Sequence, residues 1–130
     1  MSGNKILIDT NIVIEIFGGN KQFANQIRRL SEFYIPSVVI GELYVGVNRV
    51  TNKLKHLRML NRFVGLGIVL SIDEGTAKHY GEIVASLYKK GRPIPTNDIW
   101  IAALAKQHNF TLVSSNKHFK EIEKLKSVSW

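Results

Sequence analysis

Short apolar runs, separated by more polar segments, dominate the pattern of this chain. Four of these runs are rich in isoleucine, leucine, valine and aromatic residues. Continuous rather than alternating apolar runs are typical of strands that are buried on both faces, as in parallel sheets. We therefore predict four buried strands, at residues 5–8, 33–35, 67–70 and 111–114.

Helical periodicity fills the segments between these runs. Segment 73–89 is the clearest case, because Asp73 is a suitable N-cap and apolar residues recur behind it at helical spacing. The same reasoning predicts helices at residues 10–17, 20–30, 37–48, 52–63, 97–107 and 117–126. In the helix 97–107, Ile101, Leu104 and Ala105 should face the core.

The alternation of strands and helices favours an α/β fold. Parallel strands joined by helical crossovers form a sheet that helices cover on both faces, and we expect four or five strands here. Such sheets bind ligands beyond the carboxyl ends of their strands. Residues that directly follow the predicted strands are therefore the first candidates for a functional site.

Composition narrows the class of protein. The length of 130 residues suits a single domain, residues 1–130. The absence of cysteine excludes disulfides, thiolate zinc sites and cysteine nucleophiles, and it suits a reducing compartment. No stretch approaches the roughly 20 apolar residues of a membrane span, so we expect a cytoplasmic protein. The net charge of +8 favours a polyanionic partner such as nucleic acid, or else a solvated lysine-rich surface.

Only ten residues are acidic, and three of them stand out by position. Asp9 closes the first predicted strand, Asp98 opens a predicted helix and Glu42 lies inside another. The carboxamide of Asn116 follows the last predicted strand as Asp9 follows the first. Structural interpretations stay open: Asp9 and Asn116 could be helix N-caps. Asp98 could interact with a helix dipole, and Glu42 could face solvent.

Two glycines, Gly41 and Gly46, flank Glu42. Each costs about 1 kcal/mol inside a helix relative to alanine. They therefore predict close packing or a close backbone approach near Glu42.

Carboxylates that converge in a fold repel one another. Two of them about 5 Å apart oppose each other by roughly 3 kcal/mol at an effective dielectric near 20. A hard cation between them removes this repulsion, and oxygen ligands select magnesium or manganese over zinc. Such a cation can lower the pKa of a water molecule to near neutrality and so activate it against a phosphodiester.

Metal-free alternatives fit the sequence poorly. The four histidines, His56, His79, His108 and His118, lie in unrelated segments, show no zinc-ligand spacing and are expected at the surface. No phosphate-binding P-loop and no dinucleotide fingerprint is present.

Four segments, in order along nearly the whole chain, give it a family resemblance. They are Ile8-Asp9-Thr10-Asn11, Gly41-Glu42-Leu43, the segment from Asn97-Asp98 to Ala103, and the segment from Val113 through Asn116 to Phe119. With these segments the chain resembles the PIN-domain ribonucleases, and among them the VapC-like toxins of prokaryotic type II toxin–antitoxin systems. The resemblance implies a three-layer α/β/α fold and Mg²⁺- or Mn²⁺-dependent hydrolysis of RNA, with 5′-phosphate and 3′-hydroxyl products.

The resemblance also implies roles for individual residues and for partners. It assigns metal binding to Asp9, Glu42 and Asp98, and supporting roles to Thr10 and Asn11. Asn116 is a further candidate catalytic residue and Ser114 a further candidate supporting residue. It further implies a VapB-like antitoxin and a homodimer. The chain departs from the family where Asn116 replaces the fourth acidic residue and Ser114 replaces the usual threonine. Asn116 adds no charge but could orient a metal-bound water, and it keeps open the alternative of a PIN-like module that binds nucleic acid without cutting it. A PIN-like RNA-processing factor outside any toxin pair is a further alternative.

Basic residues gather on several predicted helices, including Lys53, Lys55, Arg58 and Arg62. Such runs are usually solvated helix faces, whereas those near a crevice could contact RNA phosphates. Helices 20–30 and 52–63 carry apolar stripes, and an exposed part of a stripe would suit an antitoxin segment.

Overall fold

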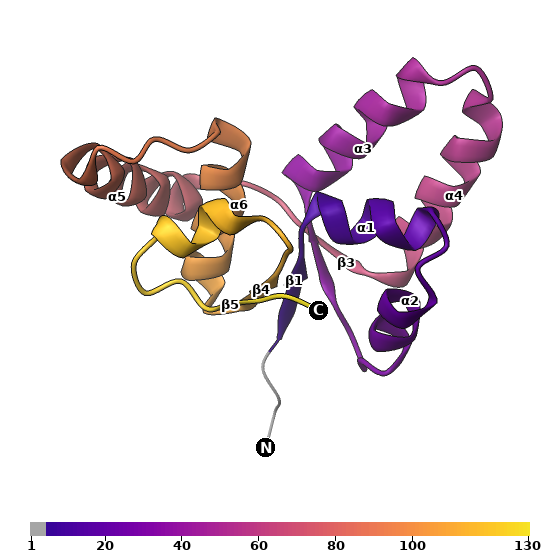
Figure 1. Ribbon diagram of the computed structural model, residues 1–130, viewed down its shortest axis with the longest axis horizontal. Coiled ribbons are helices and arrows are strands. Elements are labelled where there is room, and N and C mark those ends of the chain that lie inside the picture. The colour runs from indigo at the N-terminus through magenta and orange to yellow at the C-terminus, as the bar shows by residue number, and fades with distance from the viewer. Residues whose placement is uncertain (1–4) are drawn as a thin grey trace.

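The computed structural model describes residues 5–130, so residues 1–4 of the expected domain lie outside the described part. In chain order the elements are β1 (Ile6–Ile8), α1 (Thr10–Phe17), α2 (Lys21–Arg28), β2 (Tyr34–Pro36), α3 (Ser37–Arg49), α4 (Lys53–Leu66), β3 (Ile68–Leu70), α5 (Glu74–Lys90), α6 (Thr96–His108), β4 (Thr111–Val113), the 3-10 helix η1 (Lys117–Glu121) and β5 (Ser127–Val128) (Figure 1). The predicted α/β class is confirmed.

All five strands pair in parallel, in the order β3-β2-β1-β4-β5. From β1, the chain adds β2 and then β3 on one side of the sheet. It then crosses over and adds β4 and β5 on the other side of β1. The direction of building therefore reverses between β1 and β4, which is the switch point where such sheets bind ligands. Because Ile8 pairs with Val113, the residues that follow these two strands lie side by side.

The prediction of a last helix at residues 117–126 is wrong. The segment forms only the short helix η1, which ends at Glu121, and Lys124 adopts a left-handed φ of 60°. The chain then pairs with β4, where Leu112 N donates to Lys126 O at 2.9 Å and Ser114 N donates to Val128 O at 3.0 Å. These backbone hydrogen bonds satisfy the outer edge of β4, which a helix could not do.

Strand β3 also departs from expectation, because it is not buried. Ile68 and Val69 are each 41% exposed. The strand lies at one edge of the sheet and has a neighbour on only one side, β2. The apolar sequence of β3 therefore predicts a strand correctly, but its prediction that the strand is buried is wrong.

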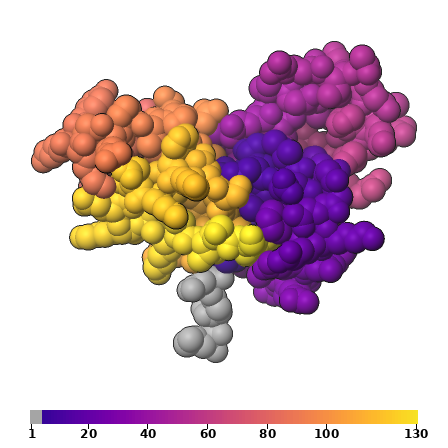
Figure 2. Space-filling view, in the orientation of Figure 1, coloured from indigo at the N-terminus to yellow at the C-terminus, as the bar shows by residue number. Residues whose placement is uncertain are grey.

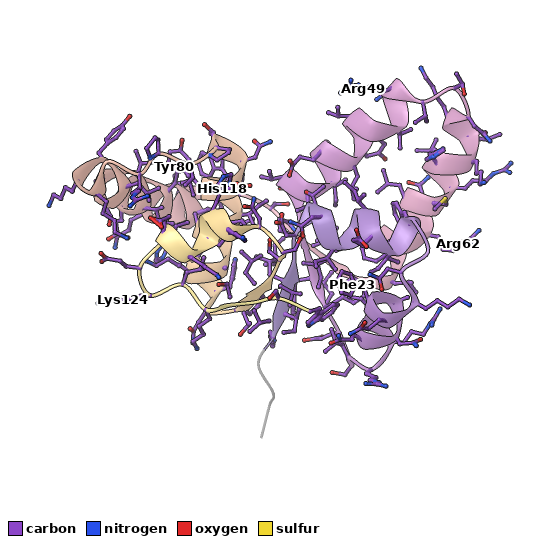
Figure 3. All side chains as sticks on the ribbon, in the orientation of Figure 1. Phe23, Arg49, Arg62, Tyr80, His118 and Lys124 are labelled. Carbon is purple, nitrogen blue, oxygen red and sulfur yellow. The ribbon has the colours of Figure 1, made fainter. Side chains whose placement is uncertain are left out.

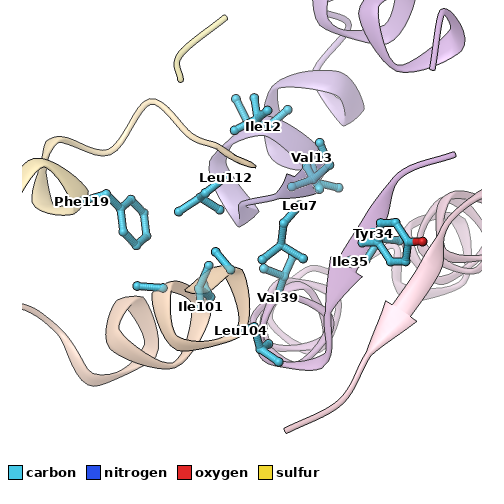
Figure 4. Packing of buried hydrophobic residues seen from close by; sticks show 14 of the residues in the cluster. Leu7, Ile12, Val13, Tyr34, Ile35, Val39, Ile101, Leu104, Leu112 and Phe119 are labelled. Carbon is cyan, nitrogen blue, oxygen red and sulfur yellow. The ribbon is translucent and has the colours of Figure 1, made fainter. Parts of the chain in front are cut away.

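The core surrounds α6 and the central strands (Figure 4). Ile101 and Leu104 are fully buried and Ala105 is 1% exposed, which confirms the predicted inward face of this helix. Ala102 and Ala103 are fully buried too, so α6 is covered on nearly all sides. A helix surrounded in this way holds its N-terminal turn, and with it Asp98, in a fixed position against the sheet.

Helices α3 and α4 form a hairpin that extends away from the sheet at the upper right of Figure 1. The space-filling view shows this hairpin, which we call the arm (residues 37–66), as a projecting lobe (Figure 2). No helix among residues 5–130 is long and apolar enough to span a membrane.

Candidate active site

Asp9 and Ser114 meet where β1 and β4 end. Asp9 is only 3% exposed. Its Oδ1 accepts from Thr10 N at 2.8 Å and so caps α1, while its Oδ2 accepts from the Ser114 hydroxyl at 2.7 Å. Asn11 Nδ2 donates to the same Oδ2 at 3.2 Å. The cap interpretation of Asp9 is thus correct, and it coexists with a carboxylate fixed at the switch point.

Glu42 approaches this site from α3. It is half-buried, and the Thr10 hydroxyl donates to its Oε1 at 2.7 Å, which leaves Oε2 available to other partners. The solvent-facing interpretation of Glu42 is therefore incomplete. The prediction of close packing at Gly41 and Gly46 is wrong. Both glycines are exposed, and a Cβ added at either would meet no atom within 4 Å.

Asp98 enters from the first turn of α6 and is 9% exposed. Asn116 Nδ2 donates to Asp98 Oδ2 at 3.0 Å, and His118 Nδ1 lies 2.9 Å from the same oxygen. Asn116 also caps η1, since its Oδ1 accepts from His118 N at 2.9 Å. The cap interpretation of Asn116 is therefore correct. Its side chain also contacts Asp98, while its role toward a metal-bound water stays a prediction.

His118 is the site residue that sequence reasoning missed. Its side chain, labelled in Figure 3, is 49% exposed, as expected for a surface histidine. Its Nδ1 nevertheless lies 2.9 Å from Asp98 Oδ2. The available signal was its position two residues after Asn116, on the first turn of η1. Because both donors reach Asp98 Oδ2, the other oxygen of this carboxylate, Oδ1, is the one available to a ligand.

The electrostatics of Asp9 link the three carboxylates. Burial raises the pKa of Asp9 above its ordinary value, and the negative charges of Asp98 and Glu42 raise it further. Hydrogen bonds from Ser114 and from Thr10 N oppose this rise in pKa. The three acidic groups are thus close enough to repel one another, and a positive charge among them would relieve this repulsion.

The donor set fits a hard cation that retains part of its water shell. Among residues 5–130, no three His, Asp or Glu side chains converge into a complete ligand set. Each of two carboxylates is instead hydrogen-bonded to neighbouring side chains: Glu42 to Thr10, and Asp98 to Asn116 and His118. Magnesium typically binds through one or two carboxylates and several waters. The oxygens of Asp9, Glu42 and Asp98 suit such a cation better than they suit zinc.

Comparison with known proteins assigns this chain to a family. Residues 6–125 match the family described as PIN domain. The chain belongs to the PIN-domain family. In this PIN domain the strand-end aspartate, the α3 glutamate and the α6 aspartate occupy the segments on which the resemblance rested.

Relatives of this PIN domain match over almost their full length. Ribonuclease VapC1 of Rickettsia felis is 34% identical over 128 residues, which span 95% of each chain. The tRNA(fMet)-specific endonuclease VapC of Shigella flexneri is 29% identical over 129 residues, 97% of this chain and 98% of the relative. In the crystal structure of VapBC2 from Rickettsia felis bound to a promoter DNA fragment, a chain aligns with a TM-score of 0.91 at 29% identity, covering 96% of this chain and 98% of that one.

Proposed function

We propose that this PIN domain is a metal-dependent endoribonuclease and the toxin of a VapBC-type pair. Asp9, Glu42 and Asp98 hold the divalent cation, Mg²⁺ or Mn²⁺. The observation that carries the proposal is the buried Asp9 at the switch point, which hydrogen bonds connect to the other two carboxylates. Thr10 contacts both Asp9 and Glu42. Ser114 and Asn116 connect Asp9 to Asp98. The ribonuclease names of the VapC relatives support RNA as the substrate.

The residues of the chain prepare the site by fixing the carboxylates. Ser114 and Asn11 orient Asp9 through Oδ2, Thr10 orients Glu42, and Asn116 with His118 orients Asp98. A cation bound there would supply charge neutralisation at the phosphodiester and a lowered pKa for the attacking water. The free Oε2 of Glu42 is the oxygen best placed to bind this cation or to accept a proton. Hydrolysis then leaves a 5′-phosphate and a 3′-hydroxyl.

The structure offers a groove for the VapB-like antitoxin expected from the family. The groove has a volume of about 640 Å³ and lies between α1, α3 and α4. Ile14 and Val47 line it together with Glu42, and Ile14 is 56% exposed. An apolar antitoxin segment bound there would reach one of the proposed catalytic carboxylates and block RNA. The homodimer and the cytoplasmic location stay predictions, and the former can be tested by light scattering.

RNA cleavage with defined cations tests the proposal. Purified protein is incubated with an RNA pool that includes initiator tRNA, in Mg²⁺, in Mn²⁺ and in EDTA, alongside Asp9→Asn and Asp98→Asn. We expect cutting that needs the cation and falls by at least about 100-fold in both variants, as when transition-state charge stabilisation is lost.

Other outcomes have distinct meanings. Cutting that survives EDTA or either substitution would reject the metal-site mechanism. RNA binding without cutting would favour the non-cleaving binding module, for which the amide of Asn116 at the fourth acidic position is the supporting feature.

A further inference from the structure

The charge of this protein is unevenly distributed along the chain. Five of the 18 lysines and arginines, and none of the ten acidic residues, lie between Glu42 and Asp73, within the arm. The five are Arg49, Lys53, Lys55, Arg58 and Arg62, and all of them are exposed. Among residues 5–130, ion pairs form at Lys5, His79, Arg92 and His118, and none forms on the arm. The part of the arm beyond Glu42 is therefore a projecting cationic surface without acidic residues.

Three of these cations form a row along α4. Lys55, Arg58 and Arg62 recur at helical spacing and line one hollow of the surface. Lys55 and Arg62, at the ends of the row, are seven positions apart, which corresponds to about 10 Å along the helix axis. Figure 3 shows Arg62 on α4 and Arg49 on the distal part of α3, both pointing outward from the arm.

The row continues a path that starts at the candidate active site. Lys55 lines the hollow on α4 and also the groove that contains Glu42. Met59 is likewise shared by both. A polyanion that contacts the row can therefore extend without a break toward the acidic site.

We propose that this basic row of α4, Lys55 with Arg58 and Arg62, binds the phosphate backbone of a base-paired stem in a folded RNA. The inference rests on the proposed ribonuclease function and adds a second contact, on the arm, to the one at the carboxylates. The acidic site then cuts an unpaired segment next to the stem that the arm holds.

The character of α4 decides between a paired and an unpaired ligand. Proteins that bind single strands combine positive charge with exposed aromatic rings on which bases stack. Phe63 provides the one aromatic ring of α4 apart from His56, and it is 6% exposed. The exposed aromatic ring of the arm, Tyr44, lies on α3. A row of cations on α4 without an exposed phenyl or indole ring on the same helix suits the phosphates of a duplex, which proteins recognise mainly through shape and backbone.

Charge reversal on the arm tests the inference. Arg58→Glu with Arg62→Glu is compared with Lys78→Glu with Lys89→Glu, which makes the same change of charge at exposed positions of α5. The charge-neutral pair Arg58→Gln with Arg62→Gln is the second arm variant, and circular dichroism establishes that each is folded. Binding to an RNA stem-loop and to a DNA duplex of the same sequence is measured in EDTA across a salt series. Cleavage of the stem-loop and of a short unpaired oligonucleotide is measured with Mg²⁺.

We expect the arm reversal to weaken stem-loop binding about tenfold or more near 0.1 M salt, and to flatten the salt dependence by roughly 0.7–0.9 log units per lost phosphate contact. Cleavage of the short oligonucleotide should stay within about threefold of wild type. Stem-loop binding equal to that of the α5 control would overturn the inference, and so would a larger loss for DNA than for RNA. Absence of RNA binding by the wild type would overturn it as well. Arm-dependent binding without any cutting would reject the nuclease proposal alone.

Discussion

At the scale of single residues, Asp9 concentrates the electrostatics of the site. Its carboxylate is buried, lies near two other negative charges and is fixed by three neighbouring donors. The donors orient the oxygens, while burial and the other carboxylates destabilise their charge. A bound cation would remove this electrostatic cost, so we expect the site to be more stable with a cation than without one.

Replacing Asp9 by asparagine should therefore stabilise the cation-free protein at neutral pH. A carboxyl whose folded pKa lies above its ordinary value of 3.8 binds protons more tightly when folded, so its ionised form destabilises the fold. This penalty is complete above the folded pKa and disappears as the pH falls toward the unfolded value. Urea unfolding in EDTA should show Asp9→Asn to be more stable than wild type at pH 7, with a smaller difference at pH 4.

Added cation should reverse this order. A ligand at 100 times its dissociation constant stabilises the folded state by about 2.7 kcal/mol, and only the wild type should gain this from Mn²⁺. An equal gain in Asp9→Asn would mean that the cation binds elsewhere.

Removing the Ser114 hydroxyl should make the site more sensitive to acid. The hydrogen bond from Ser114 lowers the pKa of Asp9, so Ser114→Ala raises that pKa further. The acid limb of the cleavage–pH profile should move to higher pH, and stability should fall by about 1–3 kcal/mol. Ser114→Thr keeps the hydroxyl and is the matched control. An unmoved acid limb in Ser114→Ala would contradict this role.

The sequence predicted the acidic residues of the site better than their partners. Asp9 and Asp98 were recognisable because one follows a strand and the other opens a helix beside the sheet. The contact of His118 with Asp98 depends on the single turn of η1, where a helix through residue 126 was expected. Contacts set by one irregular turn leave little periodic signal in a sequence.

At the scale of elements, α3 contains a glycine that lowers helix stability although no close packing requires it. Gly41 is exposed and a Cβ there would meet no atom within 4 Å. Gly41→Ala should therefore raise the free energy of unfolding by about 0.5–1 kcal/mol, measured by urea denaturation in EDTA.

Gly67 provides the contrasting control. A Cβ at Gly67 would lie 2.7 Å from the Phe33 ring and 2.8 Å from Ile35 Cδ1. Gly67→Ala should lower stability by about 1–3 kcal/mol because the core must shift to accept it. A loss of stability in Gly41→Ala would show that α3 makes contacts absent from this structure.

The limits of pattern reading are also visible in β3 and β5. Residues of β3 are apolar although the strand is an exposed edge, because apolar composition reports strand propensity as well as burial. The two residues of β5, Ser127 and Val128, are too few to produce any period. Their place is set by the unpaired edge of β4, which is a long-range property of the fold.

At the scale of the whole molecule, three features adjoin one another: the acidic site, the apolar groove and the cationic row of the arm. Glu42 belongs to both site and groove, and Lys55 belongs to both groove and row. An antitoxin segment in the groove would therefore compete with RNA at both of its proposed contacts.

The central claim is that the three carboxylates bind the cation on which RNA cleavage depends. The most direct measurement is a Mn²⁺ titration in which binding, from the electron paramagnetic resonance of free Mn²⁺, and single-turnover cleavage are recorded on the same sample. The account predicts that both curves share one half-saturation point, and that Asp9→Asn and Asp98→Asn lose binding and cleavage together. Cleavage that saturates without binding, or binding that persists at full strength in both variants, would contradict it.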